Sequence, residues 1–291
     1  AHPMAILSSV VGALSTFYQD SLDPHDPAQV EVSIHRLIAK LPTIAAYSYK
    51  KSFGQPFVYP LNDLNYCQNF LQMMFAVPSE PYEIDPDFVA ALNLLLIVHA
   101  DHEQNCSTHT MRSAGSSHAD SYSALAGAIG ALSGPLHGGA NEKAMELISK
   151  FDDVESASKA VYKMLENKEL IMGFGHAVYK TQDPRNEIIK KWSRTLSEGK
   201  SNSKLYFISC KIEKIMKEEK NLFANADFFH ASTYHFMNIP TKLFTPIFVC
   251  SRISGWAAHI IEQRLDNKLI RPGAKYVGKD PMSFISLNER S

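Results

Sequence analysis

Apolar residues recur every three to four positions along most of this 291-residue chain, and that spacing is the strongest constraint on its fold. Near the start they stand at Ile6, Val10, Leu14 and Phe17, which would share one face of a helix. The period-2 alternation of a half-buried strand does not extend over any long run of the sequence. The sequence therefore predicts an all-α fold in which helices pack against helices.

The same spacing places further helices along the chain. Pro42 is expected to kink or divide one of them. The Ala- and Gly-rich segment 121–133 is expected to be a tightly packed central helix. The segments that follow residue 140 are more charged, which indicates a second, more solvated lobe. Helices are predicted over residues 6–18, 30–49, 62–76, 87–100, 121–133, 142–151, 154–167, 186–196, 203–220, 231–237 and 243–264.

Charge and cysteine usage exclude several classes of protein. With 29 basic and 30 acidic residues the net charge is -1, so we expect no general attraction to nucleic acid or to an anionic membrane. The apolar run 90–98 is too short to span a bilayer, and the longer stretch 243–261 carries charge at Arg252. The four cysteines are far apart and form no CxxC pair, which favours reduced thiols and a cytoplasmic location over a zinc or disulfide framework.

A histidine flanked by glycines, His137, stands in the stretch 133–142. Asn141 is expected to cap a helix that starts there. The positive end of that helix would disfavour the imidazolium, so a neutral His137 could donate a hydrogen bond to a substrate oxygen. A glycine-rich turn with a surface histidine is the alternative.

The stretch 99–110 gathers many polar groups directly after an apolar helical segment. One interpretation is a metal site, since His99 and His102 would share a helix face. The HExxH arrangement is absent, however, and no third ligand is evident. We therefore favour a polar helix end that lines a cleft, in which His102 donates a hydrogen bond to an anionic substrate.

A second glycine-flanked histidine, His176, lies in the segment 173–180, with Arg185 shortly after it. The order of residues is not that of a phosphate-binding P-loop. Glycines let a ligand approach the backbone closely, and arginine binds carboxylates with two parallel hydrogen bonds. The segment therefore favours a substrate that carries a carboxylate.

Asp227 is surrounded in sequence by Phe223, Phe228 and Phe229. Apolar neighbours disfavour the charged form of a carboxyl group and raise its proton affinity, which suits a general base. An ordinary helix N-cap aspartate is the alternative.

Two arginines stand in unusual places. Arg252 lies inside an apolar helical segment, where a charge needs a partner, and Arg271 lies in a loop. The partner is either a structural carboxylate or the carboxylate of a substrate. Three histidines, three arginines and one acid would together suit carbon–carbon bond formation onto a dicarboxylate.

Several ordered motifs resemble the citrate synthase family over essentially the whole chain. They are SGPLHGGANE, GFGHAVYKTQDPR, NADFF, FTPIFVCSRISGWAAHIIEQ, LIRP and YVG. The resemblance implies an all-α fold with a large domain (1–139 and 239–291, dimer-forming) and a small domain (140–238) that closes over the substrates. It implies condensation of an acyl-CoA, usually acetyl-CoA, with oxaloacetate and water to give citrate and CoA in the tricarboxylic acid cycle, with no metal and no further cofactor.

The resemblance also implies roles for individual residues. His137 would donate to the thioester oxygen, Asp227 would remove a proton from the acyl α-carbon, and His176 would polarise the oxaloacetate carbonyl. The remaining residues would bind the two substrates, with Arg271 supplied by a neighbouring subunit. They are His102, His176, Arg185, Arg252 and Arg271 for oxaloacetate, and Gly173, Phe174, Gly175, Ala177 and Val178 for CoA.

Three departures from the family pattern stand out. Family members usually begin well before the AHPM-like segment, so we expect a further N-terminal region to be absent. His230 follows NADFF, where a small residue is usual. The C-terminal third resembles 2-methylcitrate synthases, which use propionyl-CoA, and this is the alternative activity. A homo-oligomer (a dimer, or a hexamer made of three dimers) is expected; a non-catalytic helical scaffold and a metal-dependent hydrolase are remote alternatives.

Overall fold

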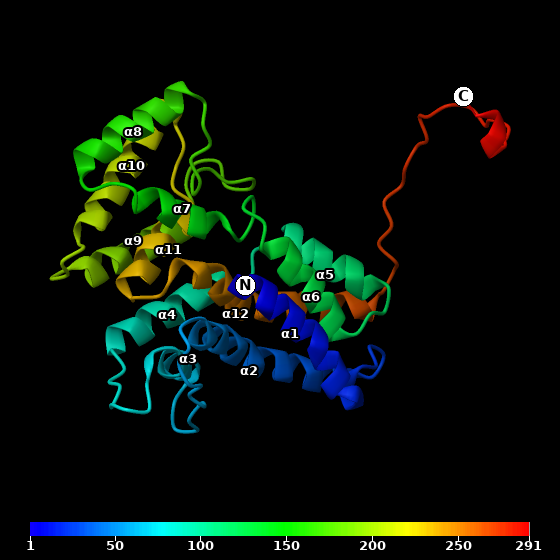
Figure 1. Cartoon of the computed structure of the whole chain (residues 1–291), viewed down its shortest axis with the longest axis horizontal. Helices are drawn as coiled ribbons and strands as arrows, with labels where there is room; N and C mark the ends of the chain where they lie inside the picture. Colours follow the sequence, from blue (N-terminus) through cyan, green and yellow to red (C-terminus); the bar gives the residue numbers. More distant parts are fainter. Residues whose placement is uncertain (291) are drawn as a thin grey trace.

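The computed structural model describes residues 1–290, and these residues form helices joined by loops (Figure 1). Within this range β-pairing is limited to two isolated bridges, Val77–Glu80 and Phe174–Ala224. The prediction of an all-α fold is confirmed. The α-helices are α1 (Pro3–Phe17), α2 (Pro27–Ser52), α3 (Tyr66–Phe75), α4 (Pro86–His99), α5 (Cys106–Ser116), α6 (Ser121–Leu132), α7 (Ala140–Ile148), α8 (Val154–Glu166), α9 (Pro184–Ser197), α10 (Lys204–Lys220), α11 (Ala226–Phe236) and α12 (Phe244–Leu265); short 3-10 turns are η1 (Gln19–Ser21), η2 (Thr241–Leu243) and η3 (Leu287–Glu289).

The helices form two groups (Figure 1). In one, α6 packs on α1 and α5, and α12 packs on α2, α4 and α5. In the other, α11 packs on α7 and α9, while α8 packs on α10. The groups meet where α4 contacts α9 and where α12 contacts α7. The assignment of domains to 1–139 with 239–291 and to 140–238 stays a prediction.

Much of the long helix α12 is buried in the protein core. Apolar side chains cover most of its circumference, among them Phe244, Val249, Trp256 and Ile260, all of which are inaccessible to solvent or nearly so. A helix that is apolar all round lies inside the protein core rather than on its surface. Arg252 is carried by this helix and is 1% exposed, so its charged side chain is held in the interior.

Three local predictions were wrong in whole or in part. Of the two alternatives for Pro42, a division of the helix is wrong, because α2 runs from Pro27 to Ser52 with Pro42 inside it. Asn141 does not cap α7; it is buried in the first turn, and Gly139 holds the cap position without a side-chain hydrogen bond.

The third error is the helix α5, which the polar sequence 106–116 did not predict. Its first turn is capped by Asn105, whose side chain accepts a hydrogen bond from the backbone N–H of Thr108. The helix packs on α6 and α12, and its buried residues include Ser107, Met111 and Gly115. The helix therefore depends on tertiary contacts more than on its own apolar pattern.

Beyond α12 the chain runs away from the other helices as an exposed tail that ends at the short turn η3 (Figure 1). None of the helices in the described part of the chain combines the length and the apolar character needed to cross a membrane.

Candidate active site

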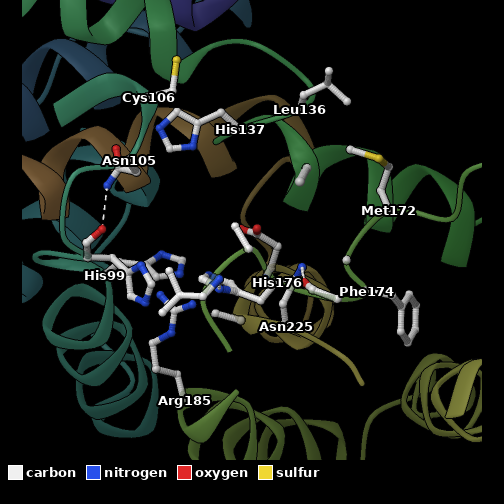
Figure 2. A pocket seen from close by; sticks show the side chains of 18 of the residues that line it. His99, Asn105, Cys106, Leu136, His137, Met172, Phe174, His176, Arg185 and Asn225 are labelled. Atoms are coloured by element: carbon white, nitrogen blue, oxygen red, sulfur yellow. Dashed lines mark hydrogen bonds between the residues drawn. The ribbon is translucent and has the colours of Figure 1, made fainter. Parts of the chain in front are cut away.

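A cavity of about 550 Å³ lies where the two groups of helices meet. Figure 2 shows His137, His176 and Arg185 gathered around the same space, although they come from distant parts of the sequence. Every predicted site residue except Arg271 lines this cavity. These residues are His102, His137, Gly173, Phe174, Gly175, His176, Ala177, Val178, Arg185, Asp227 and Arg252.

His137 lies in the loop between α6 and α7, half-buried at the edge of the cavity. Its Nε2 accepts hydrogen bonds from the backbone N–H of Ser107 (3.3 Å) and pairs with the Ser107 hydroxyl (2.7 Å). Because an amide N–H can only donate, the proton of the neutral ring is on Nδ1. Burial, assisted by the charge of Arg252, lowers the pKa of His137 to about 4. The ring is therefore a neutral donor at Nδ1.

The tautomer of His176 is also fixed by hydrogen bonds, but here Nδ1 is the acceptor and Nε2 the donor. Its Nδ1 accepts from the backbone N–H groups of Val178 (3.0 Å) and Tyr179 (3.2 Å), so the neutral ring carries its proton on Nε2. Burial, followed by the charge of Arg185, lowers the pKa of His176. Gly173 precedes it with φ +92°, and a Cβ there would lie 2.9 Å from the Phe228 side chain, so the loop needs glycine.

His102 lies in the loop between α4 and α5 and faces His176, with ring centroids 4.9 Å apart. Its Nε2 is 3.2 Å from the Tyr179 hydroxyl. Since α4 ends at His99, the two histidines do not share a helix face, and that part of the metal-site interpretation was wrong. Within residues 1–290 no group of three or more His, Cys, Asp or Glu side chains is arranged to hold a metal ion.

Asp227 stands in the first turn of α11 and lines the cavity. The cap of this helix is Asn225, whose side chain accepts from the Asp227 N–H, so the N-cap alternative for Asp227 was wrong. Its Oδ1 is shielded from solvent and has no hydrogen-bond partner among the described residues. Burial raises the pKa of Asp227 to about 6, although Arg185 and Arg252 act in the opposite direction. The carboxylate can therefore act as a base near neutral pH.

Each of the two arginines that line the cavity is held by hydrogen bonds to a neighbouring residue. Arg185 is paired with the fully buried side chain of Asp183 through Nε–Oδ1 (2.9 Å) and Nη2–Oδ2 (2.7 Å). Asp183 also accepts from the Ala226 N–H at 3.0 Å, which ties Arg185 to the start of α11. Arg252 donates from Nε to the His99 carbonyl at 2.8 Å.

The Nη1 of Arg252 is buried and has no partner among residues 1–290, and no carboxylate in that range pairs with its guanidinium. Burial lowers the pKa of Arg252 to about 10. The structural ion pair that was the alternative for this residue is therefore not formed. Arg271 lies in the exposed tail and does not line the cavity.

Several contacts within the candidate site were not predicted. Ser107 and Asp183 orient His137 and Arg185, and neither has a sequence signal other than its place beside a helix start. His230 is fully buried, donates from Nδ1 to the Ala226 carbonyl (2.8 Å) and stacks on His99 (4.0 Å between centroids). The residue therefore packs on His99 and does not line the cavity.

Comparisons with known proteins identify the family of this chain. The sequence model of the citrate synthase C-terminal domain matches residues 1–273. The chain is 44% identical to citrate synthase 1 of Mycobacterium tuberculosis and to 2-methylcitrate synthase of Shewanella oneidensis, covering all of this chain and 70% and 75% of those proteins.

Solved structures give the same result. Citrate synthase of Thermoplasma acidophilum, in a ternary complex with carboxymethyl coenzyme A and oxaloacetate, is 30% identical with a TM-score of 0.92, over all of this chain and 76% of that one. Citrate synthase of Pyrobaculum aerophilum is 36% identical with a TM-score of 0.86, over all of this chain and 74% of that one. The chain therefore belongs to the citrate synthase family and is an enzyme of that type.

Proposed function

We propose that the chain condenses acetyl-CoA with oxaloacetate and water to give citrate and free CoA, as in the tricarboxylic acid cycle. The observation that carries the proposal is the chemistry of one cavity. A carboxylate with a raised pKa, Asp227, shares it with two neutral histidines whose donor nitrogens are fixed, His137 and His176. Family membership supports the same reaction.

The first step is removal of a proton from the α-carbon of the acyl thioester by Asp227. A thioester α-proton is far less acidic than a carboxylic acid, so the base needs help. His137 supplies it by donating from Nδ1 to the thioester oxygen, where negative charge develops. The hydrogen bonds that Ser107 makes to Nε2 hold the ring in the required tautomer.

The enolate carbon then attacks the carbonyl carbon of oxaloacetate, and the carbonyl oxygen takes a proton from Nε2 of His176. Four side chains that we call the oxaloacetate clamp, namely His102, His176, Arg185 and Arg252, bind the second substrate. In both arginines a hydrogen bond holds the Nε in place. Other N–H groups of each guanidinium can then bind the carboxylates of the substrate. Water finally cleaves the citryl thioester and releases CoA.

The segment 173–178 would lie along CoA, since the backbone of Gly173 and Gly175 can approach a ligand closely. Closure of the small domain (140–238) on the large domain would expel water from the cavity, strengthen the hydrogen bonds to the enolate and protect the thioester from early hydrolysis.

A second candidate is 2-methylcitrate synthase, which the match to the Shewanella protein favours at the same identity as the match to a citrate synthase. The two substrates differ by one methylene group. In a hydrophobic pocket this difference is worth only about 1–3 kcal/mol, so one site can accept both acyl groups.

Thiol release measured with acetyl-CoA and propionyl-CoA side by side, each with oxaloacetate, tests the proposal. We expect release with both and a higher kcat/KM with acetyl-CoA. A large preference for propionyl-CoA would reverse the order of the two candidates, and no thiol release with either would favour a non-catalytic scaffold. In Asp227→Ala we expect no condensation, while oxaloacetate binding stays measurable by calorimetry.

The proposal includes a homo-oligomer, a dimer or a hexamer made of three dimers, in which the partner's tail supplies Arg271 to the clamp. The exposed position of Arg271 and of apolar tail residues such as Phe284 supports this idea. The four unpaired cysteines support a cytoplasmic location.

A further inference from the structure

The loop that carries His102 lies directly on α12, the helix that carries Arg252. The Nε of Arg252 donates to the carbonyl of His99 at 2.8 Å, and the backbone N–H of Gly255 donates to the carbonyl of Ala100 at 3.0 Å. The last carbonyl groups of a helix have no partners within the helix. Donors on α12 therefore satisfy the end of α4 and fix where the His102 loop begins.

Contact between α12 and this loop is unusually close at Gly255. A Cβ added at this position would lie 2.7 Å from Asp101 Oδ1 and 2.8 Å from Asp101 Cβ, distances that real side chains do not adopt. Only glycine lets the loop rest on the helix at this separation.

One turn further along α12, His259 places its Nε2 at 3.1 Å from Asp101 Oδ1. Neither side chain lines the cavity. Asp101 directly precedes His102 in the sequence, while His259 shares a helix with Arg252. The Asp101–His259 pair therefore connects the two elements that present these two members of the oxaloacetate clamp.

The charge of Asp101 also acts on Arg252. The guanidinium of Arg252 is buried without a paired carboxylate, and burial lowers its pKa. Among the nearby carboxylates, Asp101 opposes that shift most strongly, ahead of Asp227. Asp101 thus helps to keep Arg252 charged without occupying the N–H groups that a substrate would use.

We propose that Asp101 and His259 are positioning residues of the oxaloacetate clamp: they hold the His102 loop on α12 so that His102 and Arg252 keep the spacing that a dicarboxylate requires. This inference rests on the proposed function. It assigns to two side chains outside the cavity a specific effect on oxaloacetate affinity, distinct from a general effect on folding.

The test measures oxaloacetate binding by calorimetry, together with steady-state thiol release, in the full chain, three test variants and one control variant. In His259→Leu we expect oxaloacetate Kd and KM to rise about tenfold, the loss of one hydrogen bond to a charged group, with kcat and the KM for acetyl-CoA within about threefold of the parent. His259→Gln keeps an N–H donor and is expected to restore most of the affinity. Asp101→Asn keeps a polar contact but removes the charge, so an intermediate loss is expected.

His235→Leu is the matched control, because His235 is also half-buried and pairs through Nε2 with a neighbouring side chain, Asn202, away from the cavity. Melting temperatures of all variants separate a folding effect from a clamp effect. Unchanged oxaloacetate affinity in His259→Leu, or an equal loss in His235→Leu, would overturn the inference. A parent chain that binds no oxaloacetate would instead overturn the proposed function.

Discussion

The Nε2 atom of His137 lies 2.7 Å from the hydroxyl oxygen of Ser107, the second residue of α5. The backbone N–H of the same serine donates to the same nitrogen. Through these two contacts a helix that the sequence pattern did not predict determines which nitrogen of His137 is left to donate in the cavity.

Ser107→Ala should lower the rate of condensation. The substitution removes the hydroxyl but keeps the backbone donor. The preference of His137 for the tautomer with its proton on Nδ1 is therefore weakened but not lost. We expect kcat to fall roughly tenfold, the value of one hydrogen bond, with the KM for oxaloacetate unchanged. Steady-state thiol release measures both. Thr110→Ala on the same helix is the control, because the Thr110 hydroxyl bonds only within α5, to the Cys106 carbonyl; equal losses in the two variants would contradict the role of Ser107.

Activity should depend on pH through Asp227. Because its pKa is about 6, the base is mostly deprotonated above pH 6 and mostly protonated below it. His137 has a pKa of about 4 and stays neutral across this range. We therefore expect kcat/KM for acetyl-CoA to fall about tenfold per pH unit below pH 6. Thiol release measured between pH 4.5 and about 8.5 would show this fall in kcat/KM, and a flat profile would contradict the assignment of Asp227 as the base.

The same carboxyl group should make the protein less stable at neutral pH. The native chain binds more protons at Asp227 than the unfolded chain does between about pH 4 and pH 6, so its contribution to the free energy of unfolding falls as pH rises through that window. The rise in the pKa of Asp227 from 3.8 to about 6 corresponds to about 3 kcal/mol. Asp227→Asn should therefore be inactive yet more stable than the parent at pH 7, with no advantage at pH 4. Denaturant unfolding at both pH values measures the difference, and equal stabilities at pH 7 would show that Asp227 is not destabilised by burial.

The helices could be predicted from the sequence where apolar spacing is a local property, as in α1 and α12. α5 could not, because Met111 is the only large apolar residue on its buried face and the helix depends on packing against α6. The start of α11 was placed five residues too late, at Ala231, because its first turns bury polar side chains such as His230.

Of the candidate site, the residues that touch the cavity could be predicted and those behind them could not. His137 and His176 have glycine neighbours and belong to ordered motifs. Ser107 and Asp183 act through partners 30 and two residues away, and nothing in their own segments distinguishes these contacts from ordinary helix starts. The electrostatic cause was also only partly predictable, since burial and Arg252, rather than the start of α7, lower the pKa of His137.

Asp183→Asn should weaken oxaloacetate binding. The buried carboxylate holds Arg185 with two hydrogen bonds and holds the start of α11 through the Ala226 N–H. An asparagine can accept at only one of these positions and leaves the guanidinium without its counter-charge. Breaking such a pair costs about 3–5 kcal/mol, shared between folding and binding. We expect at least a tenfold rise in the KM for oxaloacetate and a lower melting temperature.

Lys190→Gln is the comparison for Asp183→Asn, because Lys190 of α9 forms an ion pair with Glu213 of α10 and does not line the cavity. A loss of stability without a change in KM is expected there. The same pattern in Asp183→Asn would mean that Asp183 stabilises the fold but does not orient Arg185.

Gly138→Ala should disturb catalysis through the backbone that follows His137. A Cβ at this position would lie 2.6 Å from both the carbonyl oxygen and the Cγ of Leu132, a buried residue at the end of α6, so the loop must move. Overpacking of this kind costs on the order of 1–3 kcal/mol, and the displaced imidazole would no longer meet Ser107. We expect kcat to fall at least tenfold, measured by thiol release alongside the melting temperature.

Gly134→Ala in the same loop is the control, since its Cβ would make an ordinary 3.7 Å contact with the Ala131 carbonyl and should leave kcat unchanged. If Gly138→Ala lowered the melting temperature but kept full kcat, the position of His137 would not depend on this turn.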